Sequence, residues 1–272
     1  MANRFAVLGS PIGHSKSPLL HRAATAALGV DAEYTAVDVT EDQFPTFLGS
    51  QGEEWLGFSL TMPLKHVVRP LLVDECETSR LTGSVNTIVR GDGGWHGYNT
   101  DVWGAQTAIA QSLGTHFRSA TVLGSGATAS SIVAALNASG VVDLTVVARD
   151  VTKATVTAEL GARLGMTTHA VEWGTVATQT DLLVNTLPAS VEIPADVVDD
   201  LDAGALFDVV YDPWPTQLAR EWTARGLPSS SGLLMLLWQA VRQARLFYGD
   251  GVDEQLPNES MVVTAMRSAV GL

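Results

Sequence analysis

The stretch Ala120-Thr-Val-Leu-Gly-Ser-Gly-Ala-Thr-Ala129 decides the fold of this chain. Its first four residues form a short apolar run typical of a buried strand, and a helical pattern begins near its end. The turn between them matches the G-x-G-x-x-G/A fingerprint that links strand to helix in dinucleotide-binding folds. There the first glycine permits a tight turn, the second lets the backbone approach a pyrophosphate, and the final small residue allows close helix packing. The sequence therefore predicts a dinucleotide site on Gly124, Ser125, Gly126, Ala127, Thr128 and Ala129.

The residues after this turn continue a regular alternation of strands and helices. Strands are expected at residues 120–123, 144–148, 181–185 and 205–211, and helices at residues 128–139 and in a segment ending near Gly165. Because parallel strands need crossover helices of this kind, the pattern predicts a Rossmann-type, doubly wound parallel sheet.

The first hundred residues alternate shorter elements, so the fold class is α/β throughout. Strands are expected at residues 5–8, 33–38, 57–60, 85–89 and 95–98, with helices at 18–28, near 41–48, from Pro63 onward and at 101–113. The alternation restarts in a more regular form after this last helix, which predicts a domain boundary. We expect an N-terminal α/β domain over residues 1–101, a dinucleotide-binding domain over 102–232, and a segment 233–272 whose helix over 233–248 returns to the first domain.

Composition and charge narrow the class of function. The chain has 272 residues, of which 46% are hydrophobic and 17% charged, as in an ordinary globular protein. Its 16 basic and 29 acidic residues give a formal charge of −13, which repels nucleic acid and anionic lipid surfaces. No nucleic-acid or membrane partner is expected, and an anionic small molecule would need a locally positive pocket.

The cysteines, histidines and apolar runs carry further expectations. A single cysteine, Cys76, excludes an internal disulfide, and the first residues lack the apolar stretch of a secretory signal. No apolar run approaches the roughly 18 residues of a membrane span. The six histidines show no paired metal-ligand spacing. We expect a cytoplasmic protein without a metal site.

The segment Ala148-Arg-Asp-Val-Thr-Lys153 bears on which dinucleotide binds. An NAD-binding fold usually offers an acidic residue to the ribose 2′-hydroxyl at this place, whereas here an arginine follows the strand. The Arg149 guanidinium and the Lys153 ammonium suit a 2′-phosphate, which favours NADP. Asp150 leaves NAD open, because a carboxylate there would repel the phosphate or bind a ribose hydroxyl. Arg149 as a solvated surface residue is the remaining alternative.

Three segments outside this domain suggest a site for an anionic, hydroxylated substrate. After the first strand, Ser17 is placed to cap a helix in which Pro18 takes the first position, and a helix start suits a carboxylate. Lys65 is expected in the first turn of a helix opening at Pro63, where the positive end of the dipole disfavours the ammonium and suits a general base. Asp101 would orient Lys65. Taken one by one, these residues have simpler structural interpretations: Ser17 as a helix cap, Lys65 as a surface lysine and Asp101 as a capping aspartate.

Eight segments together resemble the shikimate dehydrogenase family over nearly the whole chain. They are His14-Ser-Lys-Ser-Pro18, Thr61-x-Pro-x-Lys65, Gly83-Ser-Val-Asn-Thr87, Gly97-Tyr-Asn-Thr-Asp101, the glycine turn, Asn185-Thr-Leu-Pro188, Asp208-Val-Val-Tyr-Asp-Pro213 and Gly232-x-x-Met-Leu-x-x-Gln239. The resemblance implies reversible hydride transfer between NADPH and 3-dehydroshikimate, giving shikimate in aromatic amino acid biosynthesis. It also implies an N-terminal substrate domain joined to a Rossmann domain, and a monomer or homodimer.

The resemblance assigns roles to particular residues. It implies that Ser15 and Ser17 bind the substrate carboxylate with Tyr211 nearby, and that Lys65 with Asp101 moves the proton. The residues implied to hold the ring hydroxyls are Thr61, Asn86 and Gln239.

The chain departs from the family pattern at three places. Ser59 stands where the family often has Asn, which removes an amide from the pocket wall. Ala148-Arg149-Asp150 replaces the usual Asn-Arg-Thr at the adenosine phosphate, and Leu234 precedes Met235 where glycine is common near the nicotinamide.

Three alternatives to this function differ from it in particular residues. An NAD-dependent quinate/shikimate dehydrogenase commonly has Thr in place of Ser17 and an acidic residue in place of Arg149. A non-catalytic sensor on the same scaffold would be expected to lose Lys65 or Asp101, and both are present. A folate-linked NADP dehydrogenase finds no support in the loop around Ser15.

Overall fold

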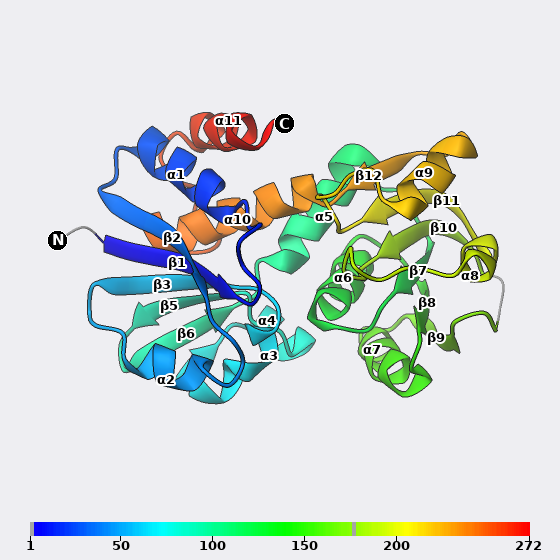
Figure 1. Ribbon diagram of the computed structural model, residues 1–272, viewed down its shortest axis with the longest axis horizontal. Helices are drawn as coiled ribbons and strands as arrows, with labels where there is room; N and C mark the ends of the chain where they lie inside the picture. The colour runs from blue at the N-terminus through cyan, green and yellow to red at the C-terminus, as the bar shows by residue number, and fades with distance from the viewer. Residues whose placement is uncertain (1–2, 176–177) are drawn as a thin grey trace. The chain divides into compact units, whose positions relative to one another are not determined.

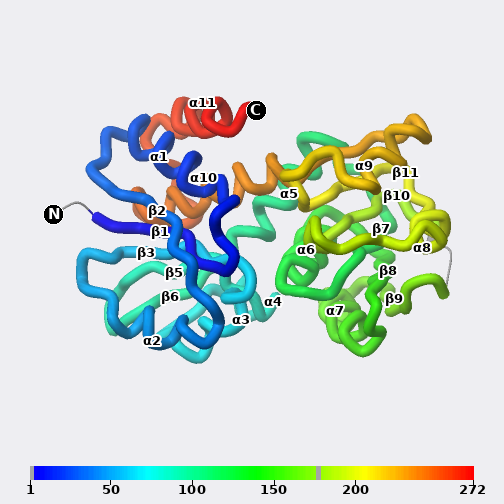
Figure 2. The backbone as a smooth tube through the Cα atoms, in the orientation of Figure 1, coloured from blue at the N-terminus to red at the C-terminus, as the bar shows by residue number. Residues whose placement is uncertain are grey.

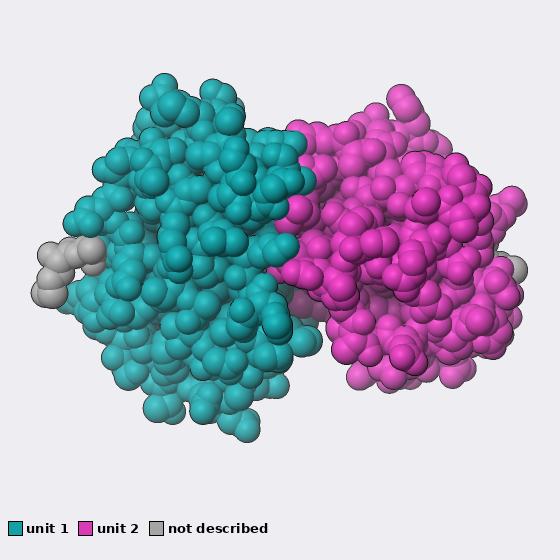
Figure 3. All heavy atoms as spheres, turned by 45° about the horizontal axis from the view of Figure 1, so that its top comes forward, with its two compact units in different colours: residues 1–100, 236–272 teal, residues 101–235 magenta. Residues whose placement is uncertain are grey.

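The computed structural model describes residues 3–175 and 178–272, and the chain forms two compact units. The first unit comprises residues up to 100 together with 236–272, and the second comprises residues 101–235 (Figure 3). The domain boundaries predicted from the sequence lie after residues 101 and 232.

The first unit is built on a six-stranded mixed sheet (Figure 1). Its elements are β1 (Asn3–Gly9), α1 (Ser17–Leu28), β2 (Ala32–Asp38), α2 (Phe44–Gly49), β3 (Trp55–Leu60), α3 (Leu64–Val67), β4 (Asp74–Glu75), α4 (Glu77–Thr82), β5 (Thr87–Gly91) and β6 (Gly94–Tyr98). The strand order is β2-β1-β3-β5-β6-β4. Strands β1, β2 and β3 are parallel, whereas β5 is antiparallel to both β3 and β6. The Gly91–Gly94 turn closes the β5–β6 hairpin.

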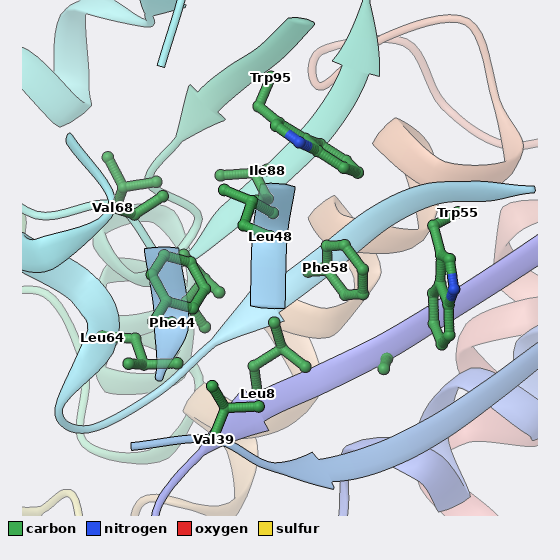
Figure 4. Packing of buried hydrophobic residues seen from close by; sticks show 13 residues of the cluster. Leu8, Val39, Phe44, Leu48, Trp55, Phe58, Leu64, Val68, Ile88 and Trp95 are labelled. Carbon is green, nitrogen blue, oxygen red and sulfur yellow. The ribbon is translucent and has the colours of Figure 1, made fainter. Parts of the chain in front are cut away.

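Strand β1 is buried on both faces because its alternate side chains enter two different clusters. Ala6 and Leu8 join a cluster with Phe44, Phe58 and other apolar residues of the sheet and α2. Figure 4 shows Leu8 beside Phe58, and the Phe58 ring stacks on Trp55 with centroids 5.0 Å apart. On the opposite face, the neighbouring β1 residues join a second cluster that includes Phe247 and Tyr248 near the C-terminal end of the chain. This explains why β1 reads as a continuous apolar run.

Two C-terminal helices complete the first unit. Helix α10 (Leu233–Tyr248) carries Phe247, whose ring centroid lies 4.9 Å from that of Phe5 on β1. Helix α11 (Glu259–Val270) packs along α1, as the tube in Figure 2 shows. The Arg245 guanidinium donates to both carboxylate oxygens of Glu259 at 2.7 Å, and both side chains are nearly buried. This bidentate pair fixes the start of α11 against α10.

The second unit confirms the predicted doubly wound parallel sheet. Its elements are α5 (Asp101–Ser112), β7 (Ser119–Leu123), α6 (Ala127–Ala138), β8 (Asp143–Ala148), α7 (Val151–Arg163), β9 (Thr167–Glu172), β10 (Thr178–Asn185), α8 (Ala195–Asp199), β11 (Leu201–Asp208), α9 (Gln217–Ala224) and β12 (Ser229–Ser231). The order β12-β11-β10-β7-β8-β9 is parallel at every pairing. The strand order reverses between β7 and β10, which is the place where such sheets bind ligands.

The structure corrects several predicted elements. The strand expected to run to Tyr211 ends at Asp208, whose carboxylate accepts hydrogen bonds from the Val210 N–H and the Thr216 hydroxyl and so turns the chain. The helix expected near Glu41 begins at Phe44. The elements β4, α4, β9, α8, α9, β12 and α11 were not predicted. Among the described residues, no helix has the length and apolar character needed to cross a membrane.

Candidate active site

The glycine turn lies between β7 and α6, where its residues have the conformations that the fingerprint requires. Gly124 has φ of +102°, and an added Cβ would lie 2.5 Å from the Thr186 hydroxyl oxygen. Gly126 is the exposed N-cap of α6, and a Cβ there would meet no described atom within 4 Å. Ala129 is fully buried against the sheet. A pyrophosphate therefore has open space beside the backbone N–H groups of this helix start.

Arg149 and Asp150 follow β8 and play different structural parts. The Asp150 carboxylate caps α7 by accepting from the N–H groups of Thr152 and Lys153, at 2.9 and 3.4 Å. This capping gives Asp150 a local structural role that was not predicted from the sequence. Arg149 is exposed, and its guanidinium lies over the Trp173 ring at 5.8 Å. Lys153 is also exposed, in the first turn of α7.

Trp173 is a candidate site residue that was not predicted from the sequence. It directly follows β9, and its backbone N–H donates to the Ala148 carbonyl at the end of β8. Its indole Nε1 is buried and has no hydrogen-bond partner within the described part of the chain. No sequence motif marks it, because its position depends on the pairing of β8 with β9.

The loop after β1 places Ser15 and Ser17 at the start of α1, but neither residue is its N-cap. Lys16, not Ser17, is the N-cap, and α1 begins at Ser17. The Ser15 hydroxyl oxygen accepts from the Ser17 N–H at 3.3 Å, so Ser15 supports the helix start. The prediction of Ser17 as the cap was wrong because the Lys16 carbonyl already accepts the first bonds of the turn, from the N–H groups of Leu19 and Leu20. Ser15 is half-buried, and Ser17 is buried.

Lys65 lies in α3, directly after β3 and Thr61. The Thr61 N–H donates to the Leu8 carbonyl, and the Lys65 carbonyl accepts from the Val85 N–H at 2.9 Å. Buried Leu64 anchors the turn from within. Helix α3 is a single turn of four residues, of which Lys65 is the second. The expected effect of a helix dipole on Lys65 is therefore wrong, because one turn of helix gives no separated positive end.

Asn86 and Gln239 meet in the first unit although they are 153 residues apart in sequence. Asn86 precedes β5 and Gln239 lies on α10, and the Asn86 Nδ2 donates to the Gln239 Oε1 at 3.4 Å. The Asn86 Oδ1 accepts from the Thr100 N–H at 2.8 Å, while the Gln239 Nε2 donates to the Leu236 carbonyl. Both side chains are at most 7% exposed. The pair offers one donor and one acceptor side by side, which a hydroxyl group can satisfy together.

A buried polar cluster adjoins this pair and was not recognised from the sequence. Ser59, one of the family departures, accepts from the Tyr34 hydroxyl at 2.7 Å and donates to the Gln243 Oε1 at 2.9 Å. The His21 ring stacks on Tyr34 at 4.0 Å between centroids. Burial lowers the pKa of His21 to about 3, against a smaller raising effect of its hydrogen bond to Gln243. Burial also raises the pKa of Tyr34, opposed by hydrogen bonds with Ser59 and Ser17. His21 is therefore neutral at physiological pH.

The remaining predicted residues lie in the second unit. Asp101 is buried and begins α5. Tyr211 is half-buried in the loop after β11. At the ends of β10 and β11, the Asn185 Nδ2 donates to the Asp208 carboxylate at 3.0 Å, and burial raises the pKa of Asp208 against these hydrogen bonds. A pocket of about 470 Å³ opens beside them, lined in part by Asn185.

The fold and these sites define the class of protein: a two-unit α/β oxidoreductase with a Rossmann-type sheet. Residues 7–88 match the model of the shikimate dehydrogenase substrate binding domain. The chain is 30% identical to the NADP(+) shikimate dehydrogenase of Synechocystis sp., over 97% of this chain and 96% of that protein.

Two solved structures resemble it over almost their whole length. Shikimate dehydrogenase of Mycobacterium tuberculosis is 38% identical with a TM-score of 0.86, covering 98% of this chain and 99% of that one. The enzyme of Thermus thermophilus, in complex with NADP(H) and shikimate, is 32% identical with a TM-score of 0.82, covering 99% and 100%. The chain belongs to the shikimate dehydrogenase family.

Proposed function

We propose that this protein catalyses the reversible NADPH-dependent reduction of 3-dehydroshikimate to shikimate, a step of aromatic amino acid biosynthesis. The observation that carries the proposal is the pairing of Asn86 with Gln239, which joins two separate family motifs at one buried donor–acceptor pair. A ring hydroxyl inserted there accepts from the Asn86 Nδ2 and donates to the Gln239 Oε1. Thr61, half-buried at the end of β3, supplies a further hydroxyl contact.

The substrate carboxylate would bind at the start of α1. Ser15 and Ser17 bring hydroxyl groups to this helix start, and helix N–H groups favour a negative charge. The family resemblance implies that the Tyr211 hydroxyl also contacts the substrate carboxylate. In a chain of formal charge −13, local donors of this kind are needed to hold an anion.

Lys65 and Asp101 would carry out the proton transfer. Bound NADPH supplies the hydride that reduces the substrate carbonyl carbon. As that carbon is reduced, the carbonyl oxygen takes a proton from the Lys65 Nζ, and in the reverse direction Lys65 removes the hydroxyl proton. Asp101 orients the ammonium and the reacting hydroxyl. Holding these groups in place lowers the entropic part of the barrier.

The dinucleotide would bind along the glycine turn from Gly124 to Ala129, with its adenosine 2′-phosphate at Arg149 and Lys153. The open space at Gly126 suits a pyrophosphate, and Arg149 is an exposed guanidinium next to the end of β8. Because the Asp150 carboxylate caps α7, it is engaged by backbone N–H groups. These features favour NADP over NAD.

The test is a steady-state comparison of shikimate and quinate, each with NADP+ and with NAD+, followed by nicotinamide absorbance. We expect the highest kcat/KM for shikimate with NADP+. A higher value for quinate with NAD+ would identify a quinate dehydrogenase instead, and inactivity with all four pairs would favour a sensor.

Cellular location and assembly are further parts of the proposal. We expect the enzyme in the cytoplasm. The family resemblance implies that it is a monomer or a homodimer. Light scattering of the purified protein separates the two assemblies by mass, and cell fractionation tests the location.

A further inference from the structure

A continuous chain of hydrogen bonds leads from the C-terminal end of α10 to Asn86. The Tyr248 hydroxyl lies 3.3 Å from the His21 Nδ1, and the His21 Nε2 lies 3.2 Å from the Gln243 Oε1. The Gln243 Nε2 donates to the Thr87 hydroxyl oxygen at 3.0 Å and to the Asn86 carbonyl at 3.4 Å. The Thr87 hydroxyl then donates to the Asn86 Oδ1 at 2.9 Å.

The direction of every bond in this chain follows from one obligate acceptor. The Asn86 backbone carbonyl can only accept, so the Gln243 amide must turn its Nε2 toward it. The Gln243 Oε1 then faces His21 and Ser59 and accepts from both. His21 therefore carries its proton on Nε2 and accepts from Tyr248 at Nδ1, which agrees with a neutral ring.

Thr87 links the orientation of the Gln243 amide to that of the Asn86 side chain. Because its oxygen accepts from Gln243, its own proton is free to point at the Asn86 Oδ1. That oxygen also accepts from the Thr100 N–H at 2.8 Å and from the Thr100 hydroxyl at 3.2 Å, so three donors hold the Asn86 carbonyl oxygen on the protein side. The Asn86 Nδ2 is thereby turned toward the Thr100 hydroxyl oxygen, at 2.8 Å, and the Gln239 Oε1, at 3.4 Å.

Burial makes this arrangement stiff. His21 and Thr87 are 0% exposed, and Gln243 and Asn86 are each 1% exposed. The Gln243 amide accepts two bonds and donates two, which uses its full capacity. A buried group that loses such a partner has no water to replace it, so alternative orientations of the Asn86 amide are strongly disfavoured.

We propose that Gln243 is a positioning residue for substrate recognition: acting through Thr87, it fixes the direction in which Asn86 presents its amide to a ring hydroxyl. This inference rests on the proposed function, because it concerns the hydroxyl bound between Asn86 and Gln239. Gln243 itself touches no substrate in this scheme.

The main test replaces Thr87, since Thr87→Val keeps the shape of the side chain and removes only the relay. We expect the KM for shikimate to rise about tenfold, the size expected for one misdirected buried hydrogen bond. The kcat should stay within about twofold, because the contact with one hydroxyl is lost equally from the bound substrate and from the transition state. The KM for NADP+ should not change. Thr87→Ser restores the hydroxyl and should restore the KM.

A matched control is Thr121→Val, which removes another fully buried strand threonine, bonded to the Thr180 hydroxyl in the second unit. It should leave the KM for shikimate unchanged while lowering stability to a similar extent. Gln243→Met should raise the KM as Thr87→Val does. The double variant should be no worse than the poorer single variant, because both changes break one route.

Binding of the three monodeoxy analogues of shikimate, measured by calorimetry, locates the effect. The penalty of Thr87→Val should vanish for the one analogue that lacks the hydroxyl held by Asn86, and persist for the other two. An unchanged KM in Thr87→Val, no rescue by Thr87→Ser, or an equal penalty for all three analogues overturns the positioning role while shikimate remains the substrate. A wild-type enzyme that does not oxidise shikimate overturns the proposed function, and this inference with it.

Discussion

At Lys65, the motif predicted the position of the residue in the fold, whereas the physical argument for its role fails. The spacing of Thr61 and Lys65 placed the lysine after a strand, which the structure bears out. The expected destabilisation of its ammonium form by a helix dipole does not hold, since α3 is one turn long. The proton-transfer role of Lys65 therefore depends on position next to the substrate, together with Asp101, and remains a prediction.

The substitution Lys65→Ala tests that role. We expect kcat to fall by about 10²- to 10⁴-fold, the usual contribution of a general acid or base, because no other group would deliver the proton. Shikimate binding, measured by calorimetry, should stay nearly unchanged. Turnover close to that of the wild type would remove Lys65 from the chemistry.

Arg149 is the residue expected to make binding of NADPH tighter than binding of NADH. Arg149→Ala should weaken NADPH by about 10- to 100-fold, the size of one charge-assisted hydrogen bond, and NADH far less. Fluorescence titration with both nucleotides measures the two affinities. Equal losses would show that Arg149 does not contact the 2′-phosphate.

The variant Trp173→Leu leaves Arg149 in place but removes the ring beneath it. It should weaken NADPH binding more than NADH binding, by a smaller factor than Arg149→Ala.

At the scale of elements, α1, β2 and α10 are joined by buried His21. Its ring stacks on Tyr34 of β2 and bonds to Gln243 of α10. Such a residue cannot be distinguished in sequence from a surface histidine, because its neighbours come from segments up to 227 positions away. Its burial has a consequence for the pH dependence of stability.

His21 should destabilise the protein as the pH falls. The unfolded chain binds a proton near pH 6.5, whereas the folded chain does so only near pH 3. Unfolding is therefore favoured as pH falls from 6.5 toward 3, and the free energy of unfolding should drop by about 2 kcal/mol between pH 8 and pH 5 from this group. Urea denaturation at several pH values measures it.

The variant His21→Phe provides the comparison for this pH dependence. It keeps an aromatic ring against Tyr34, so it should be less stable at pH 8 but lose less stability on acidification. His116→Gln, which changes an exposed histidine, should retain the slope of the wild type. An identical slope in His21→Phe would show that His21 is not the group responsible.

At the scale of the whole molecule, the chain forms two units, and the first is assembled from both ends of the sequence. Residues 236–272 supply Gln239 to the pair with Asn86, Gln243 to the polar cluster and Phe247 to the apolar face of β1. The second unit carries the glycine turn within one continuous segment. The first unit is thus expected to hold most of the predicted substrate contacts, and the second the dinucleotide.

Hydrogen exchange should separate the two ligands by unit. Saturating shikimate should slow exchange in residues 86–100 and 236–248, whereas NADP+ should slow it in residues 119–153. At about 100 times Kd, bound-state protection should approach a hundredfold for amides that exchange by local opening of the site. Protection of residues 119–153 by shikimate alone would contradict this division.

Much of the fold was predictable because its signals are local. The apolar runs of β1, β7 and β8 and the conformational demand on Gly124 are all encoded within a few residues. The short elements β4, β9 and β12 were missed because a two- to six-residue strand acquires its stability from the neighbour with which it pairs. The end of β11 was mislocated because the side chain of Asp208 turns the chain there.

By itself, the sequence determined the α/β class, the parallel sheet with its glycine turn, and the family to which the motifs point. Only the tertiary structure decided how polar groups are oriented: Ser15 rather than Ser17 supports the helix start, Asp150 caps α7, and Gln243 directs Thr87 toward Asn86. The reason is physical. Backbone conformation and hydrophobic periodicity are properties of neighbouring residues, whereas the direction of a buried hydrogen bond depends on every partner that burial brings into reach.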